Sequence, residues 1–195
     1  MQVIPAVLSI DKFEVYGWLK QIRDSRKFER VQIDFIDGEY ANNTTIRPAE
    51  VDLLPFLPLM FDAHLMVTEN NVLMWAKTAE KVGFDRIIPQ VESISSPGEY
   101  QGLAVDIHSP AEVILPYLDK LEAVILMAVE PGFSGQKFDT GVIEKAKYLQ
   151  RLRKYDNYRF RICVDGGVQK EHLPLLAEAG VDEVTVGVKR IQDWY

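Results

Sequence analysis

The chain has 195 residues, of which 47% are hydrophobic, which is enough to bury one sizeable core. Its net charge of -7 and its pI near 5.0 argue against a basic surface, so we expect no nucleic acid and no membrane as partner. A small phosphorylated molecule is still compatible with this charge, because local backbone N–H groups can bind it. The single cysteine, Cys163, allows no internal disulfide, and no stretch approaches the roughly 20 apolar residues that span a bilayer, so we expect a cytoplasmic protein.

Short runs rich in β-branched residues alternate with longer amphipathic stretches along the chain, a pattern typical of β/α units. The eight predicted strands are residues 3–8, 30–36, 61–67, 86–91, 102–107, 123–129, 159–164 and 183–187. The predicted helices are residues 11–25, 70–81, 110–118, 140–154 and 169–179, with a short helix opening at Pro48. Residues 92–101 are too few and too rich in turn formers for a helix.

Eight strands with short connections favour closure into a barrel over an open, doubly wound sheet. We therefore predict an α/β fold, a (β/α)8 TIM barrel, as one domain over residues 1–195. The turn-rich stretch 92–101 indicates that the helix between strands four and five is reduced or missing.

Polar residues gather at the carboxyl ends of the predicted strands, where barrels of this kind build their sites. Gln32 and Asp34 end the second strand and share one face, His64 lies on the third strand, and Asp165 follows the seventh. An inward-facing aspartate costs several kcal/mol unless a metal, a hydrogen-bond partner or a substrate compensates it, so these residues are site candidates. The alternative is that such an aspartate only caps the following turn.

Glycine-rich segments follow the last three strands: residues 130–136 after the sixth, 165–167 after the seventh, and Gly187 at the end of the eighth. In β/α barrels a phosphate commonly lies at the loops after the seventh and eighth strands, held by backbone N–H groups. Three such elements in succession predict a phosphate site, although each could also be only a turn.

Five segments carry a resemblance to a known family: IPAVLS from Ile4, VQIDFIDGEYANNTTI from Val31, DAHLMV from Asp62, LMAVEPGFSGQKF from Leu126 and VDGGV from Val164. On these segments the chain resembles the ribulose-phosphate 3-epimerase family, a family of phosphate-binding barrels, over nearly its whole length. The resemblance implies epimerisation of a phosphorylated ketose by a 1,1-proton transfer through a metal-stabilised enediolate.

Asp34 and Asp165 match the two acid/base positions of the family. Two such positions are needed because inversion at one carbon requires a proton acceptor and a proton donor on opposite faces. The resemblance also implies a divalent metal (zinc, iron or manganese) bound by Asp34, His64 and Asp165. The residues that it assigns to substrate and phosphate binding are His64, Gly132, Phe133, Ser134, Gly135, Gly166, Gly167, Gly187 and Val188.

The chain departs from the family pattern at the chemistry rather than at the fold. Gln32 replaces a metal-binding histidine, and a glutamine carbonyl is a poorer ligand than imidazole for zinc or ferrous iron, so metal binding is expected to be weaker, altered in identity or absent. Ala6, Ile36 and Gln90 replace a serine, a methionine and another histidine, and Val188 replaces a serine at the phosphate end.

These departures leave a second interpretation open, a phosphosugar-binding or sensor protein without catalysis on the same barrel. A third, the decarboxylase and synthase branch of phosphate-binding barrels, is disfavoured because the stretch from Asp62 to Val67 lacks the lysine and the final aspartate of its motif. The expected partner is a phosphorylated small-molecule sugar, and the sequence leaves a homo-oligomer open.

Overall fold

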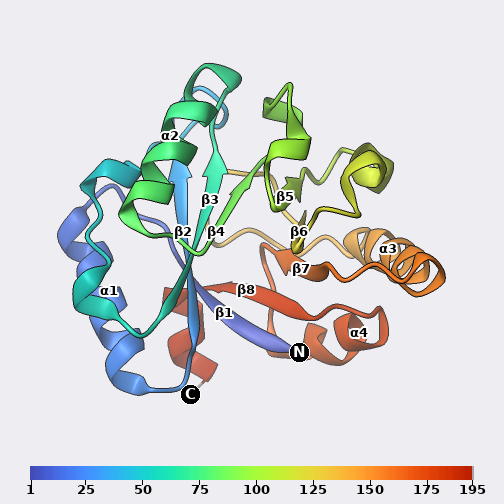
Figure 1. The fold of residues 1–195 in the computed structure, drawn as a ribbon. Helices are drawn as coiled ribbons and strands as arrows, with labels where there is room; N and C mark the ends of the chain where they lie inside the picture. The colour runs from blue at the N-terminus through green and yellow to red at the C-terminus, as the bar shows by residue number, and fades with distance from the viewer. Residues whose placement is uncertain (195) are drawn as a thin grey trace.

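The predicted strands form a ring in this computed structural model, which describes residues 1–194 (Figure 1). The strands are β1 (Gln2–Val7), β2 (Arg30–Ile36), β3 (Met60–Met66), β4 (Arg86–Pro89), β5 (Gly102–Val105), β6 (Ala123–Met127), β7 (Arg161–Asp165) and β8 (Glu183–Gly187). They pair in parallel in the order β4-β3-β2-β1-β8-β7-β6-β5, and one parallel bridge, between Gln90 and Ala104, joins the two ends. The predicted (β/α)8 barrel is confirmed, with a seam between β4 and β5.

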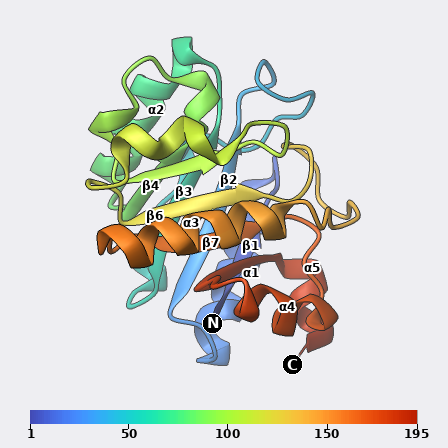
Figure 2. The same ribbon diagram turned by 90° about the vertical axis from the view of Figure 1, so that its right-hand side faces the viewer.

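Helices cover the outside of the ring (Figure 1). The α-helices are α1 (Lys12–Ser25), α2 (Glu69–Val82), α3 (Val142–Asp156), α4 (Leu173–Glu178) and α5 (Val188–Ile191). Figure 2 shows α3 lying across β6 and β7, the two strands that it contacts. The ring of helices has a gap between β4 and β5, where only two short 3-10 turns, Val91–Ser93 and Pro97–Glu99, connect the strands. The prediction of a reduced helix at this point is confirmed.

The first helix shows why these stretches fold as they do. Asp11 caps α1 by accepting the backbone N–H of Phe13 at 2.8 Å, and the helix ends at Arg26, which adopts a left-handed conformation. Its buried residues recur about one turn apart, at Val15, Leu19 and Ile22. This apolar face packs against the outer surface of the strands, in the same core cluster as residues of β2 and β3.

Two predicted helices differ from the structure. Residues 110–118 form a 3-10 helix, Ala111–Tyr117, because Pro116 lies inside it and has no N–H to complete an α-helical turn. Residues 169–179 form a 3-10 turn, Lys170–His172, followed by the short helix α4. Both elements lie outside the barrel and leave the strand ends in place. Within residues 1–194, no helix is long and apolar enough to cross a membrane.

The interior of the barrel is divided into an apolar part and a polar part. The apolar part is a small cluster from β4 to β7: Ile88, Ala104, Ile125, Met127 and Cys163. The buried polar side chains of the strands are Gln32, Asp34, Asp62, His64, Arg86, Glu183 and Thr185, which come from β2, β3, β4 and β8. Such groups are stable inside a protein only when they pair with one another, so they form two connected layers.

The lower polar layer is an ion-pair network near the amino-terminal ends of the strands. Arg86 donates to Asp62 Oδ1 at 2.8 Å and to Glu183 Oε2 at 3.0 Å. Arg30 pairs with Asp62 and Arg161 pairs with Glu183 from the sides. Because Asp62 and Glu183 are each 1% exposed, their charges depend on these guanidinium groups. Asp62 thus belongs to the base of the barrel, two residues below His64 on β3.

Arg86→Met should leave two buried carboxylates without their shared partner and lower the free energy of unfolding by about 3–5 kcal/mol. The exposed Arg159→Met is the matched control, with an expected change below about 0.5 kcal/mol. Urea unfolding of both variants measures the difference. Equal stability of the two variants would show that Asp62 and Glu183 do not depend on Arg86 for compensation of their charge.

Candidate functional site

The upper polar layer brings together three groups that the sequence places about 30 and 100 residues apart. The parallel register of β2 and β3 sets Asp34 directly beside His64, and β7 supplies Asp165 from the other side of the ring. His64 Nδ1 lies 3.1 Å from Asp34 Oδ1 and 3.6 Å from Asp165 Oδ2. The three candidate ligand atoms lie within 4.8 Å of one another. The inward orientation predicted for Gln32 and Asp34 is confirmed by these contacts.

The amide nitrogen of Gln32 lies among these three groups. Gln32 Nε2 donates to Asp34 Oδ1 at 2.8 Å and to Asp165 Oδ2 at 2.7 Å, and it lies 3.3 Å from His64 Nδ1. An amide NH2 has two hydrogens, and here each has a carboxylate acceptor. On the other side of the amide, Gln32 Oε1 accepts from the Thr185 hydroxyl at 3.3 Å. Gln32 therefore links the two aspartates through a neutral donor.

Burial and mutual charge change the protonation of this cluster. Burial raises the pKa of Asp165 to about 6, and the nearby charge of Asp34 acts in the same direction. For His64, burial opposes the charged imidazolium, but the hydrogen bond and the charge of Asp34 outweigh it and raise the pKa. Both effects favour retention of a proton among these side chains near neutral pH.

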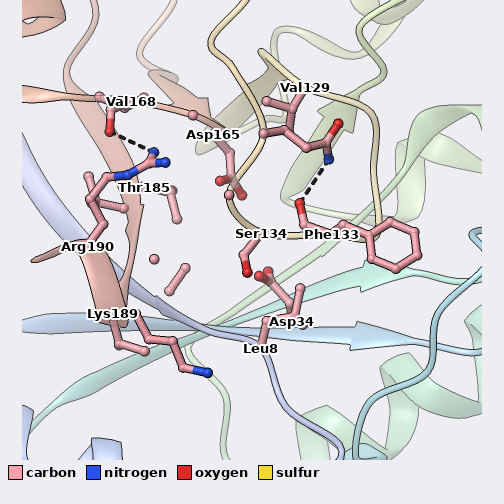
Figure 3. A pocket seen from close by; sticks show the side chains of 18 of the residues that line it. Leu8, Asp34, Val129, Phe133, Ser134, Asp165, Val168, Thr185, Lys189 and Arg190 are labelled. Atoms are coloured by element: carbon pink, nitrogen blue, oxygen red, sulfur yellow. Dashed lines mark hydrogen bonds between the residues drawn. The ribbon is translucent and has the colours of Figure 1, made fainter.

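A cavity of about 430 Å³ opens above the cluster at the carboxyl ends of the strands (Figure 3). Asp34 and Asp165 extend into it from opposite sides in this view, one from β2 and the other from β7. His64 has no exposed surface and lies beneath the cavity rather than on its wall. The other predicted substrate and phosphate residues all line the cavity: Gly132, Phe133, Ser134, Gly135, Gly166, Gly167, Gly187 and Val188.

The glycines of the β7 loop are required by the backbone itself. Gly166 has φ +106° and Gly167 has φ +65°, a region that L side chains rarely adopt. A Cβ on Gly167 would lie 2.6 Å from the backbone nitrogen of Phe138. Gly187 differs, because its φ is -55° and a Cβ there would meet no atom within 4 Å. The space that a side chain at this position would occupy is therefore part of the cavity.

The loop after β6 is held over the cavity by two amides. Gln136 Nε2 donates to the carbonyl of Glu130 at 2.7 Å and to that of Phe133 at 2.9 Å, so the loop is closed on itself. Asn43 Nδ2, from the loop after β2, donates to the carbonyl of Gly132 at 2.7 Å. The loops after β2 and β6 thus contact each other at the rim.

The donor set of the upper layer fits a divalent cation. Two carboxylates and an imidazole lie at separations that one coordination sphere spans, and rotation of the Gln32 amide would place its carbonyl oxygen as a fourth donor. That rotation turns Nε2 toward Thr185, whose hydroxyl can accept as well as donate. The residues that could hold a cation are Asp34, His64, Asp165 and Gln32.

Sequence reasoning missed three contributors to this region. Thr185 precedes Gly187 by two residues on β8 and so faces the same side, a spacing that could have revealed it. Lys189 and Arg190 line the cavity from α5, and Arg190 donates to the carbonyl of Val168 (Figure 3). They stand two and three positions after Gly187, and basic residues at this place in the sequence indicate a site for an anion.

Comparison with known proteins gives one consistent family. A sequence model of the Ribulose-phosphate 3 epimerase family matches residues 2–190. A ribulose-phosphate 3-epimerase of Bacillus subtilis (strain 168) is 34% identical over 201 aligned positions, which cover 96% of this chain and 90% of the relative. A ribulose-phosphate 3-epimerase of Helicobacter pylori (strain ATCC 700392 / 26695) is 32% identical, with 96% of this chain and 89% of the relative covered.

Solved structures share the architecture at low sequence identity. A chain of the tryptophan synthase complex of Pyrococcus furiosus superposes with a TM-score of 0.66 at 15% identity, covering 99% of this chain and 90% of that one. A 3-hexulose-6-phosphate synthase superposes with a TM-score of 0.61 at 16% identity, covering 95% and 88%. At this identity the likeness supports the barrel fold alone.

The pKa of Asp165 predicts a specific dependence of stability on pH in protein kept free of metal by a chelator. Because this pKa is about 6 in the folded chain, above the value of about 3.9 for an unfolded aspartate, the folded state binds the proton more tightly. The contribution of Asp165 to the free energy of unfolding should therefore fall as the pH rises from about 4 to about 6, by up to about 3 kcal/mol.

Asp165→Asn should lack this fall, whereas the exposed Asp119→Asn should keep it. Urea unfolding at half-unit pH steps measures both. The same pH dependence in the Asp165 variant and the wild type would contradict the raised pKa.

Proposed function

Because the chain belongs to the ribulose-phosphate 3-epimerase family, we propose that it inverts the carbon next to the ketone of a phosphorylated ketose such as ribulose phosphate. The observation that carries this proposal is the pair of carboxylates, Asp34 and Asp165, that enter one cavity from two strands. Inversion at one carbon requires a base on one face and an acid on the other. The glycine-lined end of the same cavity provides for the phosphate.

In the proposed reaction, one carboxylate removes the proton from the carbon beside the carbonyl group, which gives a planar enediolate. The other carboxyl group, which holds a proton, returns it to the opposite face. Asp165 is suited to hold that proton, since burial raises its pKa to about 6, and Asp34 then acts as base. The roles exchange in the reverse direction.

Gln32 and His64 would keep the two carboxyl groups in place during this exchange. Gln32 donates to both of them, and His64 contacts Asp34 at 3.1 Å, so neither side chain is free to turn away from the substrate. The amide stays neutral whichever aspartate carries the proton. This arrangement supports acid/base exchange between two equivalent positions.

The phosphate would bind where the loops after β6, β7 and β8 converge. Backbone N–H groups at Gly166, Gly167, Gly187 and Val188 and the glycines of the β6 loop are the candidates for this contact. Backbone donors would make the serine that Val188 replaces dispensable. Lys189 and Arg190 on the same wall add positive charge, which favours an anion.

A divalent cation would be held by Asp34, His64, Asp165 and the carbonyl of Gln32, and the mainly oxygen donors of this set suit manganese. When bound, such an ion polarises the carbonyl oxygen of the sugar as a Lewis acid. A second candidate function, a phosphosugar binder without catalysis, is favoured by one observation: the Gln32 NH2 group lies between the two carboxylates, where a cation would otherwise bind.

The test of the activity is incorporation of deuterium from solvent at the carbon next to the ketone, followed by NMR with the chain loaded in turn with manganese, zinc and iron. Wild-type protein should exchange this proton in ribulose phosphate, and Asp34→Asn and Asp165→Asn should each reduce the rate by about 10²–10⁴-fold. The exposed Asp119→Asn should exchange at the wild-type rate.

Absence of exchange with any ketose phosphate, together with calorimetric binding of the same compounds, would contradict the epimerase and support the binder. Absence of both would contradict the two proposals.

The phosphate end is tested by Gly187→Leu. The backbone at Gly187 accepts any residue and a Cβ there meets no atom, so the fold should tolerate the change while the side chain fills the cavity. The KM for ribulose phosphate should rise at least about tenfold, a loss of about 1.4 kcal/mol in binding, with no loss of melting temperature.

Gly17→Leu is the matched control, since Gly17 is exposed on α1 and a Cβ there also meets nothing. An unchanged KM in Gly187→Leu would show that the phosphate lies elsewhere.

A further inference from the structure

One buried polar atom stands out in the described part of the chain. Gln90, which follows β4, is 0% exposed, and its Oε1 has no hydrogen-bond partner. Its Nε2 lies 3.0 Å from Nε2 of His64. A buried carbonyl without a donor costs about 1–3 kcal/mol, so a residue that keeps one calls for an explanation.

His64 is held between two amides, one at each ring nitrogen. Gln32 and Asp34 face its Nδ1, and Gln90 faces its Nε2. A neutral imidazole carries its proton on one nitrogen and accepts at the other. While the Gln90 NH2 donates to Nε2, the ring proton must lie on Nδ1, where it points to Asp34. In that state Nδ1 has no lone pair for a cation.

Rotation of the Gln90 amide reverses this arrangement. Oε1, the atom without a partner, would then accept a proton carried by Nε2, and the lone pair of Nδ1 would face Asp34, Asp165 and Gln32. The Gln32 amide can rotate in the same way against the Thr185 hydroxyl. Each amide therefore has an orientation for the cluster alone and another for the cluster around a cation.

We propose that Gln90 is a positioning residue that selects which nitrogen of His64 carries the proton, and that its carbonyl accepts from Nε2 when Nδ1 binds a divalent cation. This inference rests on the cation site put forward under the proposed function. It requires no sugar phosphate, so a failed epimerase assay and a failed cation titration are separate results.

The side chain of Gln90 can be changed without removing its role in the fold. The seam of the barrel uses the backbone of Gln90, through its bridge to Ala104. Both bonds that Ser93 makes to Gln90 also go to the backbone carbonyl. A substitution that preserves the length of the side chain therefore tests the amide itself.

The test compares Gln90→Met, which has similar length and no hydrogen-bonding group suited to the ring, with Gln90→Glu, which can only accept when ionised. Calorimetric titration of metal-free protein with Mn²⁺ should show a 10–100-fold weaker affinity for Gln90→Met and an affinity at or above the wild-type value for Gln90→Glu. Gln101→Met, a change at an exposed glutamine, should bind as the wild type does. Melting curves of all variants establish that they are folded.

Proton NMR of the Zn²⁺-loaded protein supplies a readout that a purely structural role would not move. The chain has three histidines, which allows assignment of the His64 ring. We expect a downfield, slowly exchanging Nε2–H signal in the wild type and in Gln90→Glu, and its shift upfield in Gln90→Met. Equal Mn²⁺ affinity and an unshifted signal in folded Gln90→Met would overturn the proposal, as would a wild-type protein that binds no Mn²⁺.

Discussion

The two hydrogen bonds from the Gln32 amide to Asp34 and Asp165 are the interaction on which the site depends. Two carboxylates placed so close together in a buried position repel each other, and the repulsion must be offset by donors or by a proton. The amide supplies one hydrogen to each carboxylate, and burial, together with the nearby charge of Asp34, still raises the pKa of Asp165. A cation and the Gln32 NH2 group thus compete for the same space between the same oxygens.

The barrel supplies the setting for this interaction by dividing its interior. The guanidinium groups of Arg86 and Arg30 pair with Asp62 at the base, so the lower layer carries its own compensation. The small apolar cluster of β4 to β7 fills the opposite side of the ring. The upper layer is left with two carboxylates, an imidazole and amides, open to a cavity above. Because the lower layer compensates its own charges, the barrel can hold Asp34 and Asp165 close together in the upper layer, with a negative charge on at least one of them.

Much of this could be predicted from the sequence, and the failures have physical causes. The repeating pattern of short apolar runs predicts the eight strands. The spacing of two residues between Gln32 and Asp34 places both side chains on one face of β2, the face that points into the barrel. The helix predicted at residues 110–118 is a 3-10 helix in the structure, because Pro116 inside it has no N–H to complete an α-helical turn. The contacts of Gln32 with Asp165 and of Gln90 with His64 depend on strand register and side-chain rotamers, which no local pattern encodes.

In the proposed reaction, Asp34 and Asp165 flank the reacting carbon of a phosphorylated ketose. A crystal structure of the protein with bound ribulose phosphate tests it most directly. We expect the phosphate to lie against Gly166, Gly167 and Gly187, and the carbon next to the ketone to lie between the two carboxyl groups, each about 3 Å from one face of that carbon. A sugar that presents the same face to both aspartates, or a phosphate bound outside the glycine loops, would contradict it.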